Sequence, residues 1–173
     1  MRKIILSVFI VVFALSATFL LFGITGKIQK HKGITEKIQR LPSFSFMTLT
    51  NETFNSSEIR KGPVLVIRFH PECEHCQYEI SEILKSNIPA SGACVILVSS
   101  ADPDSIRKFI SQFDLSDCPA IITLTDTSNI FEDIFGSDKV PSNYIYNKEL
   151  DLVKVLYGEV KTEAILKYLL GSE

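Results

Sequence analysis

The sequence shows no excess of positive charge. Its 173 residues contain 18 Lys and Arg against 20 Asp and Glu, giving a formal net charge of −2 at pH 7 and a pI near 5.9. No segment combines clustered basic side chains with interleaved aromatics, the pattern typical of nucleic-acid-binding surfaces. We therefore expect no nucleic-acid partner.

Cysteine is also scarce, with four in the chain, too few for a small scaffold held together by disulfides. The sequence has no glycine-rich phosphate-binding loop, no pair of carboxylates placed for acid–base catalysis and no Ser/His/Asp arrangement. These absences leave the thiols as the main candidates for chemistry, and we expect no cofactor.

Two of these thiols form the most informative motif, Cys73-Glu74-His75-Cys76. The motif follows the apolar run 64–69 and precedes a helical pattern, which places both thiols at a helix N-terminus. Unpaired backbone N–H groups and the helix dipole favour negative charge there. Because the thiolate is the reactive form of cysteine, this position predicts thiol–disulfide exchange.

Two further side chains near the motif are candidates for roles in that chemistry. His75, as a cation or hydrogen-bond donor, would stabilise the Cys73 thiolate, although the negative charges of Glu72 and Glu74 oppose this effect. Glu79 lies one turn beyond the second cysteine, where it can relay a proton. The alternative for Glu79 is an exposed carboxylate that stabilises the first helical turn.

The pattern of apolar residues predicts an α/β fold with a mixed central sheet flanked by helices. A short hairpin over residues 43–54 opens the domain. Buried strands are expected at 64–69, 94–98 and 119–124, strands of a late hairpin at 142–146 and 152–157, and helices at 76–87, from 103 onward, at 127–135 and at 162–170.

A separate apolar run stands at the N-terminus. Arg2 and Lys3 precede it, and residues 4–24 contain no charge. About 20 helical residues rise roughly 30 Å, the thickness of the hydrocarbon core of a bilayer. The run is long for a cleaved signal peptide and has neither a clear A-x-A cleavage site nor a lipobox cysteine. We therefore predict a signal anchor, one transmembrane helix over residues 1–25, followed by a basic tether over residues 26–40.

Positive residues on both sides of this span leave its orientation ambiguous. A redox dithiol suits an oxidising compartment. We therefore favour a single-pass protein of the inner (cytoplasmic) membrane, with the domain of residues 41–173 on the periplasmic, extracytoplasmic side.

From about residue 41 to its end, the chain resembles the thioredoxin superfamily and, within it, the membrane-anchored TlpA/ResA-like thiol–disulfide oxidoreductases. The expected strand and helix near 119–135 look like the βα insertion of that branch. The motifs that carry the resemblance are Leu41–Phe46, Cys73–Cys76, Glu79 and Val140-Pro141.

The resemblance implies a thioredoxin-like fold in which Cys73 attacks a disulfide and Cys76 resolves the mixed disulfide. It implies a cis Pro141 facing the dithiol, where base rates alone would favour an ordinary trans proline. Val140 and Pro141 would bind the extended chain of a protein disulfide or dithiol substrate. The branch favours a reductant supplied by an upstream electron donor.

The chain departs from the family pattern at three places. Glu72 stands where most relatives have tryptophan before the first cysteine, and Glu74-His75 replaces the usual proline-containing pair. Ile67 aligns with the buried aspartate of thioredoxin, which leaves Glu79 as the acid available for proton handling. The departures bear on reduction potential and partner choice.

Other uses of the CxxC motif stay open. It could form a structural disulfide, or hold copper or zinc for delivery with Cys73, Cys76, His75 and His70 as ligands. Zinc needs about four ligands, and the sequence has no second CxxC. A peroxidase is disfavoured because the Thr-x-x-Cys context of a peroxidatic cysteine is missing.

The remaining cysteines, Cys94 and Cys118, are expected to be small buried hydrophobes. A second disulfide between them is the alternative in an oxidising compartment.

Overall fold

The computed structural model divides the chain into two units, Met1–Glu36 and Lys37–Glu173. The predicted transmembrane helix and most of the predicted tether lie outside the described residues. Among the residues that are described, no helix is long and apolar enough to cross a membrane. The structure describes residues 16, 36–59, 62–115 and 118–171.

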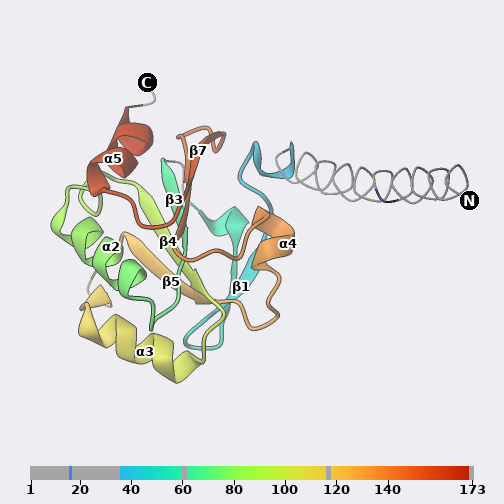
Figure 1. Ribbon diagram of the computed structural model, residues 1–173, viewed down its shortest axis with the longest axis vertical. Helices are drawn as coiled ribbons and strands as arrows, with labels where there is room; N and C mark the ends of the chain where they lie inside the picture. The colour runs from blue at the N-terminus through green and yellow to red at the C-terminus, as the bar shows by residue number, and fades with distance from the viewer. Residues whose placement is uncertain (1–15, 17–35, 60–61, 116–117, 172–173) are drawn as a thin grey trace, which may run out of the picture. The chain divides into compact units, whose positions relative to one another are not determined.

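The second unit is built on one seven-stranded mixed sheet in the order β2-β1-β5-β4-β3-β6-β7 (Figure 1). Strands β3, β4 and β5 run parallel, whereas the pairs β1–β2, β1–β5, β3–β6 and β6–β7 are antiparallel. The strands are β1 (Ser45–Thr48), β2 (Thr53–Asn55), β3 (Val64–Arg68), β4 (Cys94–Ser99), β5 (Ile121–Thr125), β6 (Ser142–Tyr146) and β7 (Leu152–Tyr157).

Helices cover both faces of the sheet, as the near-continuous apolar runs of β3 and β4 require. On one face α2, α3 and α5 contribute residues such as Ile80, Phe109 and Ile165 to a core cluster. On the other face Phe131 and Phe135 of α4 form the second cluster. The helices are the short 3₁₀ turn η1 (Ser56–Glu58), α2 (Glu74–Lys85), α3 (Pro103–Gln112), α4 (Phe131–Phe135) and α5 (Thr162–Leu170).

Helix α4 is shorter than the predicted helix over 127–135. Both oxygens of the buried Asp126 carboxylate accept backbone N–H groups, from Ile130 at 3.0 Å and from Phe131 at 2.9 Å. Asn129, which lies between Asp126 and Ile130, has a positive φ of 53°. The capping contacts and the left-handed residue hold residues 127–130 as a turn, so the helix begins at Phe131.

The compact unit also begins before the expected boundary at residue 41. Ile38 is buried in the second core cluster. The N–H of Leu152 donates to the Gln39 carbonyl, and the N–H of Leu41 donates to the Leu150 carbonyl, both at 2.8 Å. These bonds attach the entering chain to the turn between β6 and β7.

Arg68 ends β3 as a buried cation that is paired with an acidic side chain. Its Nε donates to Asp138 Oδ1 and its Nη2 to Ser100 Oγ, both at 2.8 Å. The guanidinium also lies 5.1 Å from the ring centroid of Phe131. Arg68 therefore joins the end of β3 to β4, to α4 and to the loop that precedes β6.

Cys94 and Cys118 are free thiols that pack into different clusters. Cys118 packs on the α2 face of the sheet and Cys94 on the α4 face. This arrangement gives no support to a disulfide between them.

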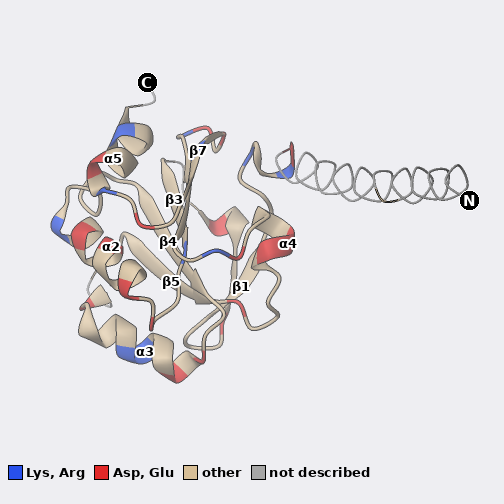
Figure 2. Cartoon of the chain, in the orientation of Figure 1, with Lys and Arg blue, Asp and Glu red and all other residues tan. Residues whose placement is uncertain are grey.

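Charged side chains of both signs are spread over the helices and loops of the described unit (Figure 2).

Candidate functional site

Cys73 and Cys76 lie at the start of α2, directly after the central strand β3, as predicted. Cys73 is the N-cap residue, and its carbonyl accepts the N–H of Gln77 at 3.0 Å. The N–H of Cys73 donates to the His70 carbonyl at 3.1 Å, and Gln77 Nε2 donates to the Pro71 carbonyl at 2.7 Å. The loop before the helix is therefore held by backbone hydrogen bonds and by the Gln77 side chain, and neither cysteine forms a disulfide.

The two thiols stand in different environments. Cys73 is half-buried, whereas Cys76 is fully buried in the α2-side core. Burial strongly raises the pKa of Cys76, and a hydrogen bond with Cys73 and the negative charge of Glu79 act in the same direction. Cys73 is thus the accessible thiol, and Cys76 is a protonated thiol held beneath it.

Glu79 is fully buried, so the alternative of an exposed helix-surface carboxylate does not apply. Its Oε1 accepts Asn143 Nδ2 at 3.0 Å, and its Oε2 accepts the backbone N–H of Val160 at 2.8 Å. Burial raises the pKa of Glu79 above its usual value; the two hydrogen bonds oppose this shift, and the charge of Glu159 adds to it. The carboxyl therefore lies near Cys76 with its proton more firmly held than in water.

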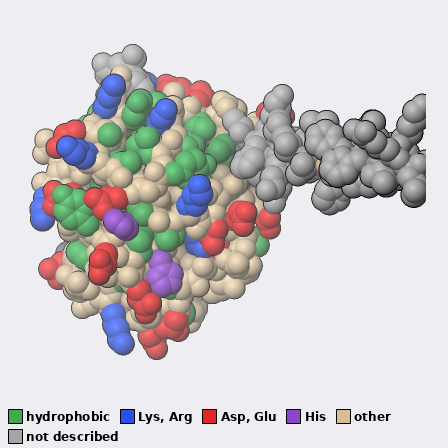
Figure 3. Space-filling model, viewed as in Figure 1, with side chains coloured by type: hydrophobic (Ala, Val, Ile, Leu, Met, Phe, Trp, Pro, Cys, Tyr) green, Lys and Arg blue, Asp and Glu red, His purple; other side chains and the backbone are tan. Residues whose placement is uncertain are grey.

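His75 contacts an acid that the sequence did not indicate. Its Nδ1 lies 2.6 Å from Oε2 of Glu159, in the loop between β7 and α5, and 73% of the His75 side chain is exposed. In the space-filling view histidine side chains lie on the viewed face, among hydrophobic and acidic side chains (Figure 3). The predicted action of His75 on Cys73 must therefore compete with Glu159.

The Val140–Pro141 peptide bond is cis, as expected. Pro141 is buried and Val140 is 38% exposed. Because β6 starts at Ser142 and pairs antiparallel with β3, opposite Arg68, Pro141 lies at the end of the sheet from which the chain enters the CxxC loop. Tyr157, 51% exposed, pairs with Ser142 and adds an aromatic surface at this edge.

The two histidines near the dithiol have other partners. His70 Nδ1 accepts the N–H of Glu72 at 3.2 Å, and His75 pairs with Glu159. Within the described part of the chain, no three His, Cys, Asp or Glu side chains gather as a metal site would require. The arrangement therefore does not support the hypothesis that the protein holds copper or zinc for delivery.

Comparison with known proteins gives the family. Residues 38–152, more than half of the chain, match the model of the AhpC/TSA family. The chain belongs to the AhpC/TSA family. It is thereby a thioredoxin-like oxidoreductase of the thioredoxin superfamily. No curated protein matches this AhpC/TSA sequence.

Solved structures show the same fold at low sequence identity. A secreted disulfide oxidoreductase from Mycobacterium tuberculosis, homologous to E. coli DsbE, has a TM-score of 0.65 at 14% identity, covering 79% of this chain and 98% of its own. An exposed lipoprotein thioredoxin from Streptococcus pneumoniae has a TM-score of 0.57 at 23% identity over 75% and 98%. A peroxiredoxin-like protein from Aquifex aeolicus has a TM-score of 0.61 at 15% identity, covering 75% of this chain and 84% of its own. The predicted thioredoxin-like fold is confirmed.

In the reduced protein, iodoacetamide at about pH 7 should modify Cys73 first. Cys73 is half-buried, whereas Cys76 is fully buried and burial raises the pKa values of both Cys76 and Cys94. Because only the thiolate reacts, buried thiols alkylate slowly. Peptide mass spectrometry after timed quenching gives the order. Equal labelling of all four thiols before unfolding would contradict the assignment.

The buried carboxyl of Glu79 should make stability depend on pH in a defined direction. A carboxyl whose pKa is raised by folding binds its proton more tightly in the native state, so the wild type loses stability as pH rises above 4.5, the ordinary value. Glu79→Gln removes this loss. The free energy of unfolding of the variant, measured in urea from about pH 4 to about pH 8, should therefore improve relative to wild type as pH rises. A constant difference would show that the Glu79 pKa is not raised.

Proposed function

We propose that the chain is a membrane-tethered TlpA/ResA-like thiol–disulfide oxidoreductase that reduces disulfides of extracytoplasmic proteins through Cys73 and Cys76. One observation carries the proposal: the N-cap residue of α2 bears an accessible thiol, and a buried, protonated thiol lies within the next turn. That asymmetry suits an attacking and a resolving cysteine.

The reaction transfers two electrons to the partner. The Cys73 thiolate attacks one sulfur of the partner disulfide, forming a mixed disulfide while the other partner sulfur leaves as a thiolate. Cys76 then loses its proton and attacks the Sγ of Cys73, releasing the second partner thiolate. The partner ends as a dithiol and the protein as a Cys73–Cys76 disulfide, which an upstream dithiol donor reduces again.

Cys76 needs help to lose its proton because burial strongly favours the neutral thiol. In this proposal Glu79 accepts that proton, directly or through one water. Because the pKa of Glu79 is itself raised, the difference in pKa between Cys76 and Glu79 is smaller than it would be for an exposed carboxyl. In the reverse direction the same carboxyl returns the proton to Cys76. Glu79 therefore acts as the proton relay in this proposal.

The edge beside Pro141 is the proposed docking surface for the partner chain. Val140 and Tyr157 expose apolar surface there. An extended peptide can bind at this end of the sheet through hydrogen bonds to the backbone next to Pro141, with side chains packing on the apolar groups. Val140 and Pro141 would then hold the partner disulfide next to Cys73.

The N-terminal sequence and the solved structures of similar fold support the proposed cellular setting. The apolar N-terminal run predicts the anchor, and the Mycobacterium protein is called secreted and the Streptococcus protein exposed. Their shared fold supports an extracytoplasmic domain. The TlpA/ResA-like motifs favour reduction of protein disulfides over their formation.

The decisive test is a trapping experiment with Cys76→Ser. The variant should attack a disulfide such as insulin or a glutathione-blocked peptide and stop at a stable mixed disulfide on Cys73, because no resolving thiol follows. Cys73→Ser should trap nothing, and Cys118→Ser should behave as wild type. Failure of the wild type to reduce the disulfide, together with turnover of hydrogen peroxide, would favour a peroxidase instead.

Glu79→Gln should slow resolution of the mixed disulfide by roughly 100-fold, the lower end of general acid–base effects. Glutamine cannot accept the Cys76 proton, although it preserves the size of the side chain. Glu82→Gln is the matched control, because Glu82 lies on the same helix with its carboxylate paired to Lys85 at the surface. Stopped-flow release of the partner thiol measures the rate. Equal rates for the two variants would reduce Glu79 to a structural residue.

A further inference from the structure

Three consecutive residues after β7 each contact a different part of the candidate site. In the segment Gly158–Val160, the first residue donates its N–H to the Pro141 carbonyl at 2.8 Å. The carboxylate of the second lies 2.6 Å from Nδ1 of His75, and the N–H of the third donates to Glu79 Oε2 at 2.8 Å. The segment therefore holds the proline, the histidine and the buried acid of the site together.

Glu159 is the one side chain of this segment that carries a charge. We propose that Glu159 is a positioning residue that holds the His75 ring and offsets its charge, so that the dithiol is less oxidising than an unrestrained His75 would make it. The inference rests on the proposed function, because it concerns the potential of the same dithiol.

The contact fixes which ring nitrogen remains free for other partners. A carboxylate can only accept hydrogen bonds, so His75 Nδ1 carries the proton in its contact with Glu159. Only Nε2 is left to face Cys73 or a partner. The carboxylate also cancels part of the positive charge that a protonated ring would present to the Cys73 thiolate.

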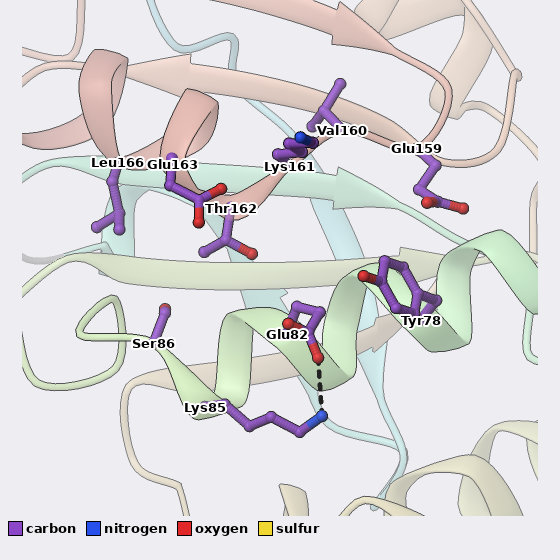
Figure 4. A pocket seen from close by; sticks show the side chains of 10 residues that line it. All are labelled: Tyr78, Glu82, Lys85, Ser86, Glu159, Val160, Lys161, Thr162, Glu163 and Leu166. Atoms are coloured by element: carbon purple, nitrogen blue, oxygen red, sulfur yellow. Dashed lines mark hydrogen bonds and ion pairs between the residues drawn. The ribbon is translucent and has the colours of Figure 1, made fainter.

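Glu159 sits in a defined place on the surface. It lines one end of a groove of about 660 Å³ between α2 and the start of α5. Figure 4 shows its carboxylate at the same end of the groove as the ring of Tyr78 on α2. Its side chain is 37% exposed and that of His75 is 73% exposed. Exposed ion pairs contribute little to folding stability, so a change in potential can be separated from a change in fold.

Loss of this carboxylate should therefore change the reduction potential of the dithiol in one direction. Without Glu159, any positive charge on a protonated His75 has no carboxylate beside it, and the ring is free to turn toward Cys73. The thiolate of the reduced form is then better stabilised, and a stabilised reduced form makes a dithiol more oxidising.

The test is a redox titration of the full chain against glutathione. In Glu159→Gln the equilibrium constant should move about tenfold toward the reduced dithiol, equivalent to about 30 mV for a two-electron couple. In a His75→Gln background the same substitution should produce a much smaller shift, because the residue through which it acts is absent. Glu163→Gln is the matched control: Glu163 lines the same groove and should leave the potential unchanged.

Two results would overturn the inference. One is an unchanged potential in Glu159→Gln. The other is an equal shift with and without His75, which would mean that Glu159 acts through its field alone. A wild-type dithiol that does not exchange with glutathione at all would instead overturn the proposed function, so the two failures are distinguishable. Thermal unfolding of each variant confirms that the fold is retained.

Discussion

The candidate site depends on one buried carboxylate, that of Glu79. A buried carboxylate is costly unless donors reach its oxygens. The two donors here come from elements far apart in sequence: Asn143 on β6 and the backbone of Val160 after β7. Satisfying them fixes α2 against β6 and the β7–α5 loop. Since α2 carries the dithiol and β6 begins directly after Pro141, one set of hydrogen bonds places the thiols relative to the proposed docking edge.

A second buried charge supports the same edge from the opposite face of the sheet. Arg68 binds Asp138 in the loop that leads to Pro141, and the ring of Phe131 covers its guanidinium. Asp126 lies 3.9 Å away and also caps the helix that carries Phe131. The strand β5 and helix α4, predicted as an insertion, therefore do more than enlarge the core. They enclose the cation that holds the proline loop.

The elements that could be predicted from sequence are those with strong local signals. The apolar run of β3, the cysteines at the next helix and the pattern over 162–170 required no distant information, and α5 has the predicted bounds. The predicted start of α4 was wrong because the Asp126 carboxylate accepts the backbone N–H groups of Ile130 and Phe131, which holds residues 127–130 as a turn. The contact between His75 and Glu159 could not be predicted. The two residues are 84 positions apart in the sequence, and an exposed pair of this kind leaves no periodic pattern.

The surroundings of Cys73 also bear on the direction of the reaction. The helix N-terminus favours its thiolate, while the acidic neighbours Glu72 and Glu74 oppose it. A cationic His75 would tip this balance toward a stabilised thiolate and thus toward an oxidant. In the structure, however, His75 Nδ1 lies 2.6 Å from Oε2 of Glu159, so this carboxylate offsets part of any positive charge on the ring. With that contribution weakened, only the helix terminus stabilises the thiolate, so the dithiol is less oxidising than a cationic His75 would make it, in keeping with the reductant that we propose.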